Sequence, residues 1–326
     1  MQPGPLNPSP PPPAQRRGPA VLAFGGNALL PDPFHPEDQE ERARDLARAV
    51  LLLLERSAGL VLVHGNGPQV GMILLRVEAT ADRLPAEPLD VLVAETQGSV
   101  GYLLTRALRN ALREQGSPVE VSSMLTQVVV DPEDPAFARP SKPIGPYYSE
   151  EVARGLRVQR GWHLEAAEGQ GWRRVVPSPR PLEVVEMVPI ADAARAGAVV
   201  VAGGGGGIPV RDDGERGLSG VEAVIDKDRT AALLALSLRA ESFVILTGVP
   251  HVSRGFGTPR ARPIPELSLA EARRLLEAEE FPRGSMRPKI EAAARYVAAT
   301  DRPALITDST TLARALEHRA GTWLAP

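Results

Sequence analysis

Three lysines, each in a distinctive short motif, are the only lysines in this chain of 326 residues. Lys142 lies in Ser-Lys-Pro-Ile-Gly, Lys227 lies in Asp-Lys-Asp, and Lys289 ends the run Gly-Ser-Met-Arg-Pro-Lys that begins at Gly284. Arginine supplies all the other side-chain cations apart from histidine. An ammonium group is a compact point charge with three rotatable donors, whereas a guanidinium is a planar fork. Keeping lysine at these positions alone indicates chemistry on a transferred phosphoryl group.

Glycine clusters follow three of the predicted strands. They are Gly25-Gly26-Asn27, Gly65-Asn66-Gly67 and the five consecutive glycines Gly203 to Gly207. Backbone amides at such turns bind anions, and ligands of open α/β sheets lie beyond the carboxyl ends of the strands. A single cluster could simply make a turn, but three at corresponding positions favour an anion site. No Walker A loop or spaced dinucleotide fingerprint occurs in the sequence.

The segments that must position these residues alternate between strand-like and helix-like patterns. Short apolar runs predict strands at 20–24, 60–63, 119–122, 126–130, 198–202, 243–246 and 304–307. Helical spacing predicts helices at 37–56, from about 68, at 87–113, 226–239 and 288–299, and at the C-terminal end. A capping box at Ser268–Glu271 opens a further helix. This order predicts a mostly parallel sheet between two helical layers, a three-layer αβα sandwich.

One stretch interrupts the alternation. Residues 131–148 are rich in proline and aromatic side chains, and residues 152–185 are polar and contain two of the three tryptophans. We expect the segment at about 131–185 to form a small lobe inserted over the sheet. Within it, the run 172–176 has the pattern of a strand.

Composition excludes several classes of function. The net charge of −3 and the pI of about 6.0 provide no field that would capture nucleic acid. Cysteine is absent, which excludes disulfides, thiolate metal sites and a cysteine nucleophile. No apolar run approaches the ~20 residues of a membrane span. We therefore expect a cytoplasmic protein that binds neither membranes nor nucleic acid.

Residues 1–19 are proline-rich and predict a disordered tail. A functional linker, a mis-assigned start codon and a cloning remnant are alternative interpretations of this segment. The remainder, residues 20–326, is expected to form one domain that includes the lobe.

The motifs together resemble the amino acid kinase family, and within it the members that phosphorylate carbamate. The resemblance covers the chain from about Ala20 to the C-terminus. It rests on the stretches 24–28, 64–71, 94–98, 134–148, 171–179, 204–210, 224–228 and 284–292.

This resemblance implies a homodimer that catalyses ATP + carbamate = ADP + carbamoyl phosphate. It implies Mg²⁺ carried by the nucleotide rather than by protein ligands, and a sheet of about eight strands with the lobe over the carbamate side. The direction that it favours is ATP formation during the breakdown of arginine or other ureido compounds.

The resemblance also implies roles for individual residues. The catalytic residues would be Lys142, Asp226, Lys227 and Lys289, with Asp226 orienting the lysines. Substrate would contact Gly25, Gly26, Asn27, Gly65 and Asn66. Nucleotide would contact Gly204, Gly205, Gly206, Thr247, Gly248, Val249, Met286, Pro288 and Lys289.

Many relatives carry a lysine just before the paired glycines, but residues 21–24 hold no cation here. We interpret Lys142, delivered by the lobe, as its replacement. An exposed loop lysine remains the alternative for Lys142, and a structural salt bridge remains the alternative for Asp226 and Lys227. For His64 we favour packing or positioning over acid–base work, because carbamate already carries an anionic nucleophilic oxygen.

Two rival functions differ in class from each other. One is another acyl-phosphate-forming or phosphate-accepting kinase of the same family, which the missing first-strand lysine and the Lys-Pro-Ile-Gly segment disfavour. The other is a nucleotide-binding regulator without catalysis, which the retention of three lysines and Asp226 disfavours. A Rossmann dehydrogenase is a more distant candidate without an acidic ribose ligand.

Overall fold

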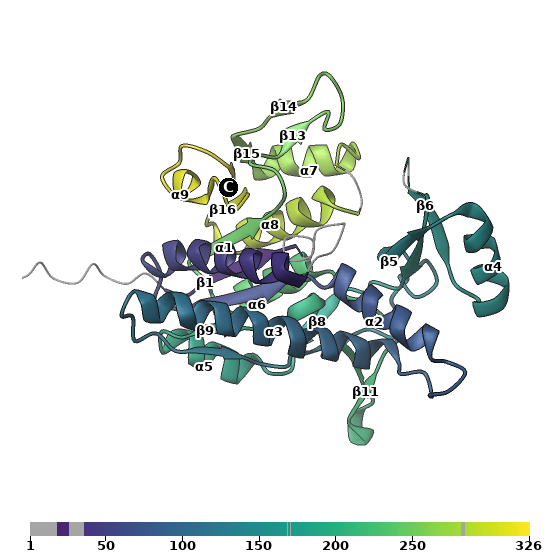
Figure 1. Ribbon diagram of the computed structural model, residues 1–326. Coiled ribbons are helices and arrows are strands. Elements are labelled where there is room, and N and C mark those ends of the chain that lie inside the picture. The colour runs from purple at the N-terminus through teal and green to yellow at the C-terminus, as the bar shows by residue number, and fades with distance from the viewer. Residues whose placement is uncertain (1–17, 26–35, 168, 170, 282–283) are drawn as a thin grey trace, which may run out of the picture.

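A computed structural model of the protein describes residues 18–25, 36–167, 169, 171–281 and 284–326 (Figure 1). Its centre is an eight-stranded sheet with the order β15-β17-β16-β12-β1-β2-β9-β3. The strands are β1 (Ala20–Phe24), β2 (Leu60–His64), β3 (Val121–Ser123), β9 (Val199–Val201), β12 (Ser242–Leu246), β15 (Glu266–Ser268), β16 (Ala304–Thr307) and β17 (Thr322–Ala325). Neighbours pair in parallel except β16 and β17, which pair antiparallel.

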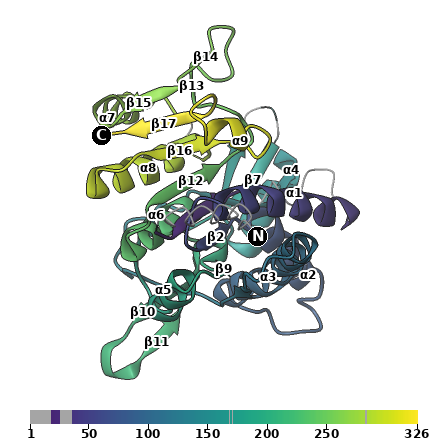
Figure 2. The same ribbon diagram turned by 90° about the vertical axis from the view of Figure 1, so that its left-hand side faces the viewer.

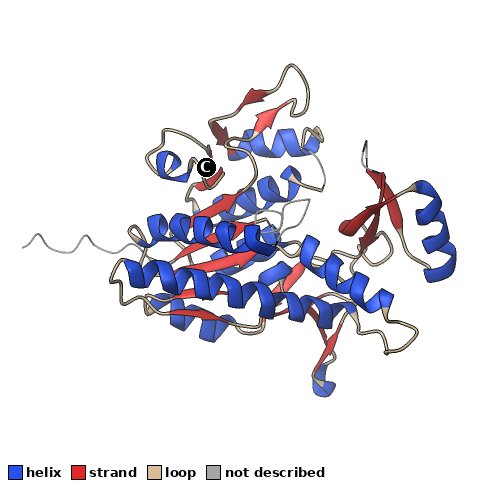
Figure 3. Cartoon of the chain, viewed as in Figure 1, coloured by secondary structure: helices blue, strands red, loops and turns tan. Residues whose placement is uncertain are grey.

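Helices cover both faces of this sheet, as Figures 2 and 3 show. They are α1 (Pro36–Leu54), α2 (Gly67–Ala79), α3 (Leu89–Glu114), α5 (Met187–Arg195), α6 (Lys227–Leu238), α7 (Leu269–Glu277), α8 (Met286–Thr300) and α9 (Leu312–Ala315). The predicted αβα sandwich with a mostly parallel sheet is therefore confirmed. Each predicted helix with stated bounds at both ends is present within two residues of those bounds.

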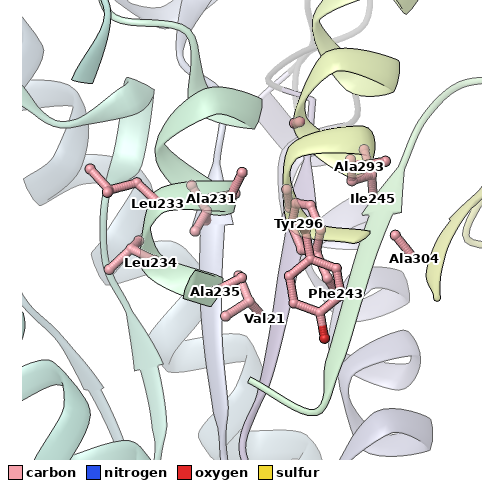
Figure 4. Close-up of a cluster of buried hydrophobic side chains, with 14 of the residues drawn as sticks. Val21, Ala231, Leu233, Leu234, Ala235, Phe243, Ile245, Ala293, Tyr296 and Ala304 are labelled. Atoms are coloured by element: carbon pink, nitrogen blue, oxygen red, sulfur yellow. The ribbon is translucent and has the colours of Figure 1, made fainter. Parts of the chain in front are cut away.

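The central strands consist of apolar residues because both of their faces are covered. Every residue of β1 and β2 is buried. Successive side chains of a strand point to opposite faces, so alternate residues enter separate cores. Val21 and Ala23 pack with residues of α6 and α8, whereas Leu22 and Phe24 pack with residues of α1 and α3. Figure 4 shows the first of these cores, with Tyr296 of α8 beside Phe243 of β12.

The lobe projects from one end of the main body (Figures 1 and 3). It consists of β5 (Lys142–Tyr148), α4 (Glu150–Arg160), β6 (Leu164–Ala167) and β7 (Gly171–Val176), and its sheet has the order β5-β7-β6. The predicted strand at 172–176 is confirmed as part of β7. The lobe docks on the main body where β5 contacts α2. A Cβ added at Gly71 of α2 would lie 2.2 Å from the Cα of Gly145 in β5, so the two backbones touch.

The segment predicted as one insertion is divided in the structure. β8 (Pro181–Val184) leaves the lobe and pairs with β4 (Gln127–Val130) in a second sheet of order β11-β10-β4-β8. The other strands of this sheet are β10 (Ile208–Asp212) and β11 (Leu218–Gly220). The sequence did not reveal β8 because its pairing partner lies more than fifty residues away and only the first and last of its four residues are buried.

The C-terminal region also differs from expectation. The sequence predicted that the chain ends in a helix, but α9 has four residues and is followed by β17. β17 lies between β16 and β15 and pairs with both. The predicted capping-box helix, α7, begins directly after β15. Ser268 accepts a hydrogen bond from the Glu271 amide at 3.1 Å, which confirms the predicted cap of α7. A short hairpin, β13 (Ser253–Arg254) with β14 (Arg262–Pro263), precedes this region.

Two sequence predictions fall largely outside what the structure describes. Residues 1–17 of the predicted tail, and Gly26 and Asn27 of the first glycine cluster, lie outside the described residues. Within the described ranges, no helix has the length and apolar character needed to span a bilayer.

Candidate active site

A cleft of about 600 Å³ lies at the carboxyl ends of β1, β2 and β12 and brings the three lysines together. Its lining includes Gly25 after β1, Gly65, Asn66 and Gly67 after β2, and Thr247 and Gly248 after β12. The lobe contributes Lys142, Pro143 and Arg173. The lysines are far apart in the sequence, so their convergence is a property of the fold.

Lys142 is held by Asp226. Lys142 is the first residue of β5, and its Nζ donates to Asp226 Oδ2 at 2.6 Å. The other carboxylate oxygen, Asp226 Oδ1, accepts from the amide of Asp228 at 2.9 Å and caps α6. Burial opposes ionisation of Asp226, but the ammonium of Lys142, assisted by Lys227 and Lys289, outweighs it and lowers the pKa of Asp226 well below its usual range.

Lys227 and Lys289 share a second carboxylate, that of Asp228. Lys227 Nζ lies 2.9 Å from both oxygens of Asp228, and Lys289 Nζ lies 3.0 Å from its Oδ2. Lys289 Nζ also donates to the Ser285 carbonyl at 3.2 Å. All three side chains are buried. The prediction that Asp226 orients the lysines is thus incomplete, because Asp228 contacts two of the three.

The pKa values of this trio depend on burial and on the shared carboxylate. Burial outweighs the attraction of Asp228 and lowers the pKa of Lys227 to about 8. Burial also disfavours charge on Lys289, but the carboxylate of Asp228 outweighs it and raises the pKa of that lysine. The two ammonium groups overcome the burial of Asp228 and lower its pKa. The cleft therefore holds preorganised charge at neutral pH.

Replacement of Asp228 by asparagine is expected to destabilise the fold. Removing one partner of a buried ion pair leaves uncompensated charge and costs about 3–5 kcal/mol in the free energy of unfolding. Urea denaturation at pH 7 measures this loss. The deficit should shrink as the pH rises towards 10, because the pKa values of the freed lysines fall and their deprotonation relieves the penalty.

The exposed Asp82 provides a matched control for that experiment, because Asp82→Asn removes the same charge from the surface. It should change the free energy of unfolding by no more than about 0.5 kcal/mol. A loss in D228N as small as this would show that the Asp228 contacts contribute little to stability.

The loop after β2 is fixed by its own hydrogen bonds. The Gly65 amide donates to the Phe24 carbonyl at 2.9 Å, so this amide already has a hydrogen-bond partner at the end of β1. Asn66 is buried and its Nδ2 donates to Thr96 Oγ1 at 2.9 Å. Of the residues predicted to bind substrate, Gly25, Gly65 and Asn66 line the cleft.

The run of five glycines packs against this same loop. A Cβ at Gly204 would lie 2.2 Å from His64 Nε2, and one at Gly205 would lie 2.2 Å from Asn66 Nδ2. Gly205 has a φ of 67°, in the left-handed region that glycine tolerates. Gly205 lines the cleft, whereas Gly204 and Gly206 are not among its lining residues. The glycine run follows β9, whereas Thr247 follows β12, and β1 and β2 lie between these two strands in the sheet.

A smaller cavity of about 240 Å³ adjoins the cleft and shares Thr247, Gly248 and Ser285 with it. Its remaining lining is Val249, Ser253, Phe256, Phe281 and Met286. A mostly apolar cavity with a few hydroxyls suits a planar base. Thr247, Gly248, Val249 and Met286, which were predicted to contact nucleotide, line it, whereas the buried Pro288 lines neither this cavity nor the cleft.

His64 is buried and does not line the described cleft, so it is poorly placed to act as a base. Burial lowers its pKa to about 4, so the imidazole is neutral at pH 7. Its Nδ1 lies 3.0 Å from the carbonyl of Gly65, and its ring abuts Gly204. These contacts favour the packing role that the sequence suggested.

Sequence reasoning did not select several residues that line the cleft. They are Arg42, Asp45 and Leu46 of α1, Arg173 of β7, Asp228 of α6, and residues 308–310 after β16. The Asp-Lys-Asp motif, in which Asp228 directly follows a candidate lysine, was the available signal for Asp228. For the residues of α1 the sequence offered no signal beyond their ordinary amphipathic pattern.

Comparison with known proteins identifies the family of this chain. The model of the amino acid kinase family matches residues 19–308. The carbamate kinase of Pyrococcus furiosus is 41% identical, with 94% of this chain and 98% of that protein covered. That of Trichomonas vaginalis is 42% identical, with 94% and 99% covered.

Solved structures show the same relationship. Carbamate kinase from Giardia lamblia bound to AMP-PNP superposes with a TM-score of 0.86 at 36% identity, covering 95% of this chain and 99% of that one. UMP kinase from Bacillus anthracis, at 13% identity and a TM-score of 0.53 over 95% and 97% of the two chains, shares the fold alone. This chain therefore belongs to the amino acid kinase family and, within it, to the carbamate kinases.

Proposed function

We propose that this protein transfers a phosphoryl group reversibly between ATP and carbamate, forming ADP and carbamoyl phosphate. The single observation that carries the proposal is the convergence of Lys142, Lys227 and Lys289 on one cleft, with Asp226 and Asp228 holding them. The full-length similarity to carbamate kinases supports the choice of acceptor. The family resemblance favours ATP formation as the direction in the cell.

The reaction requires alignment and charge neutralisation rather than proton transfer. In the direction of ATP formation, the bond between phosphorus and the carbamate oxygen breaks, and a bond to the terminal oxygen of ADP forms. Carbamate leaves as an anion, so no proton is exchanged in this step. The neutral, buried His64 is consistent with such chemistry, and the ammonium groups would stabilise charge on the transferred phosphoryl oxygens.

The positions of the lysines suggest a division of roles. Lys289 lies in the first turn of α8, beside Ser285, which borders the apolar cavity, so it would contact the nucleotide phosphates. Lys142 comes from the lobe and would contact the phosphoryl group from the acceptor side. Lys227 shares a carboxylate with Lys289 and would lie between them. Asp226 and Asp228 would set the directions of all three.

Family membership implies Mg²⁺, and these residues do not fit a metal site of their own. Asp226 and Asp228 are both engaged by lysines. Among the described residues, no group of three histidine or acidic side chains is arranged to hold a metal ion. We propose that Mg²⁺ enters with the nucleotide, where it neutralises phosphate charge.

The rate should decrease at alkaline pH because Lys227 must be protonated to act. Its pKa of about 8 in the free enzyme places the ammonium form below that pH. We expect kcat/KM for ADP to fall as the pH rises through about 8, whereas bound phosphates should raise the pKa and move the corresponding fall in kcat to higher pH. Initial rates between pH 6 and 10 with carbamoyl phosphate and ADP measure both.

Lys227→Arg is the control for the pH profile, because a guanidinium does not titrate in this range. The alkaline fall in kcat/KM should be absent in K227R, even if its rate is low. A wild-type profile that stays flat to pH 10, or the same fall in K227R, would contradict the role of Lys227.

The proposed function is tested by measuring ATP formation from ADP and carbamoyl phosphate, coupled to a glucose-phosphorylating reporter. The reverse reaction is measured with ATP and carbamate, and with acetate, an N-acyl glutamate and UMP as alternative acceptors. We expect ATP formation and a preference for carbamate. Absence of ATP formation, or a faster reaction with another acceptor, would refute the proposal.

We also propose a homodimeric assembly, which the family resemblance implies, and a cytoplasmic location, which the composition favours. The absence of cysteine is compatible with a reducing compartment. Light scattering of the purified protein tests the assembly, since a dimer has twice the 34.8 kDa chain mass.

A further inference from the structure

Arg173 lines the cleft and has no part in the proposed phosphoryl transfer so far. It lies on β7 of the lobe, opposite Tyr147 of β5 in the antiparallel register. The cleft lining contains two cations from the lobe, Lys142 and Arg173. The charge of Lys142 is paired with the carboxylate of Asp226. The contacts of Arg173 show whether its charge is paired in the same way.

The base of the Arg173 side chain is firmly held. Its Nε donates to the carbonyl of Gly145 at 2.8 Å, and its guanidinium carbon lies 5.2 Å from the centre of the Tyr147 ring. Gly145 is the residue whose backbone touches Gly71 of α2. Arg173 is thus anchored at the point where the lobe docks on the main body, which restricts the freedom of its guanidinium.

The far end of the same side chain is free to bind a ligand. In the part of the chain that the structure describes, neither Nη atom of Arg173 has a hydrogen bond or an ion pair. Arg157 of the lobe differs, because it donates to the Leu164 carbonyl and stacks on Trp172. Arg174 also has an unpartnered Nη1, but that atom is buried, the guanidinium stacks on Trp162, and Arg174 does not line the cleft. Arg173 combines an anchored base with an unpaired fork that faces the cleft.

The topology places this fork on the acceptor side. The lobe docks on α2, which follows β2, and the residues that α2 itself contributes to the cleft are Gly67 and Pro68. The base-sized cavity follows β12, and β1 separates β12 from β2 in the sheet. The lobe junction beside Arg173 is therefore on the β2 side of the cleft, whereas the smaller apolar cavity is on the β12 side.

We infer that Arg173 binds the carbamoyl end of the substrate, an inference that rests on the proposed function. A guanidinium matches a carboxylate with two parallel hydrogen bonds, and carbamate carries a carboxylate. In carbamoyl phosphate the fork would bind the carbonyl oxygen. Arg173 forms and breaks no covalent bond; it holds the acceptor while the ammonium groups neutralise the phosphoryl group.

The test compares Arg173→Lys and Arg173→Gln with the wild type, by steady-state kinetics of ATP formation. Loss of charge-assisted hydrogen bonds worth about 1.5–3 kcal/mol should raise KM for carbamoyl phosphate by ~10- to 100-fold in R173Q. KM for ADP should stay within about twofold of wild type, because the nucleotide end is untouched. R173K keeps the charge but lacks the fork, so it should recover only part of the loss.

Arg154→Gln is the matched lobe control, since Arg154 is exposed on α4 and pairs with Glu150. It should leave both KM values and the melting temperature unchanged. In Arg173→Ala, added guanidinium ion should restore part of the activity, which a purely structural role would not allow. R173A and R173Q also lose the Nε hydrogen bond to Gly145, so their melting temperature should fall by about 2–4 °C, and rescue by guanidinium ion rather than this small shift decides the role.

The outcomes separate the two proposals. An inactive wild type would refute the proposed function and this inference with it. An active wild type whose Arg173 variants show unchanged KM for carbamoyl phosphate, or equal increases in KM for both substrates, would refute this inference alone. A lowered melting temperature without rescue by guanidinium would likewise assign Arg173 a structural role.

Discussion

Replacement of Lys142 by alanine is expected to reduce the turnover number for ATP formation by about 100- to 1,000-fold. The first strand of the sheet ends in Ala-Phe before Gly25 and supplies no cation, so we propose that the lobe supplies the charge on this side of the phosphoryl group. The ammonium is held at 2.6 Å from Asp226 before substrate arrives. Because the contact involves the acceptor side, the affinity for ADP should remain close to that of the wild type.

Initial-rate kinetics and calorimetric titration with ADP measure the two quantities. Ser141→Ala is a suitable control, because Ser141 is the exposed neighbour of Lys142 and does not line the cleft. Turnover in K142A within tenfold of wild type would remove Lys142 from the mechanism. A large loss of ADP affinity would instead place Lys142 on the nucleotide side.

Replacement of Lys289 by alanine is expected to impair both binding and turnover. Loss of a hydrogen-bonded cation at the nucleotide phosphates should weaken ADP by about tenfold or more. Loss of the same charge in the transition state should cut turnover by about 100-fold or more. Together these losses should give the largest reduction in kcat/KM of any single substitution at the site, because we propose that Lys289 contributes to both nucleotide binding and phosphoryl transfer.

Arg287→Ala provides the control for K289A. Arg287 lies in the same helical turn, forms its ion pair with Glu291 at 2.9 Å, and does not line the described cleft. Its loss should leave ADP affinity and turnover near wild type. Unchanged ADP affinity together with an unchanged rate in K289A would contradict the assignment of Lys289.

The order of secondary structure could be predicted because each element carries its own pattern. The buried strand β1 is an unbroken apolar run, and β2 is apolar up to His64. The helices α1 and α3 have apolar residues at the spacing of one helical face, and α6 is a mostly apolar run that is buried over most of its length. Two strands that escaped prediction have weak local patterns. β8 and β17 are short strands whose existence depends on partners elsewhere, and a strand of four residues gains its stability from pairing rather than propensity.

The candidate site was predicted unevenly for a similar reason. The lysines, Asp226 and the glycine clusters stand out by residue type and spacing, and most of them line the cleft. Asp228 and Arg173 did not stand out, because an acidic residue at a helix start and an arginine in a polar strand are ordinary in sequence. Their contacts come from segments that approach in space: Lys289 is 61 residues from Asp228 in the chain.

By itself the sequence determined the fold class, the family and the three lysines proposed to carry the chemistry, because these depend on local patterns and on motifs in a fixed order. Only the tertiary structure decided which carboxylate holds which lysine. Asp226 caps α6 and turns one oxygen towards Lys142 of the lobe, 84 residues away, whereas Asp228, inside the first turn, faces Lys227 and Lys289. Successive residues at a helix start point in different directions, so their partners depend on which neighbouring segments pack against each side.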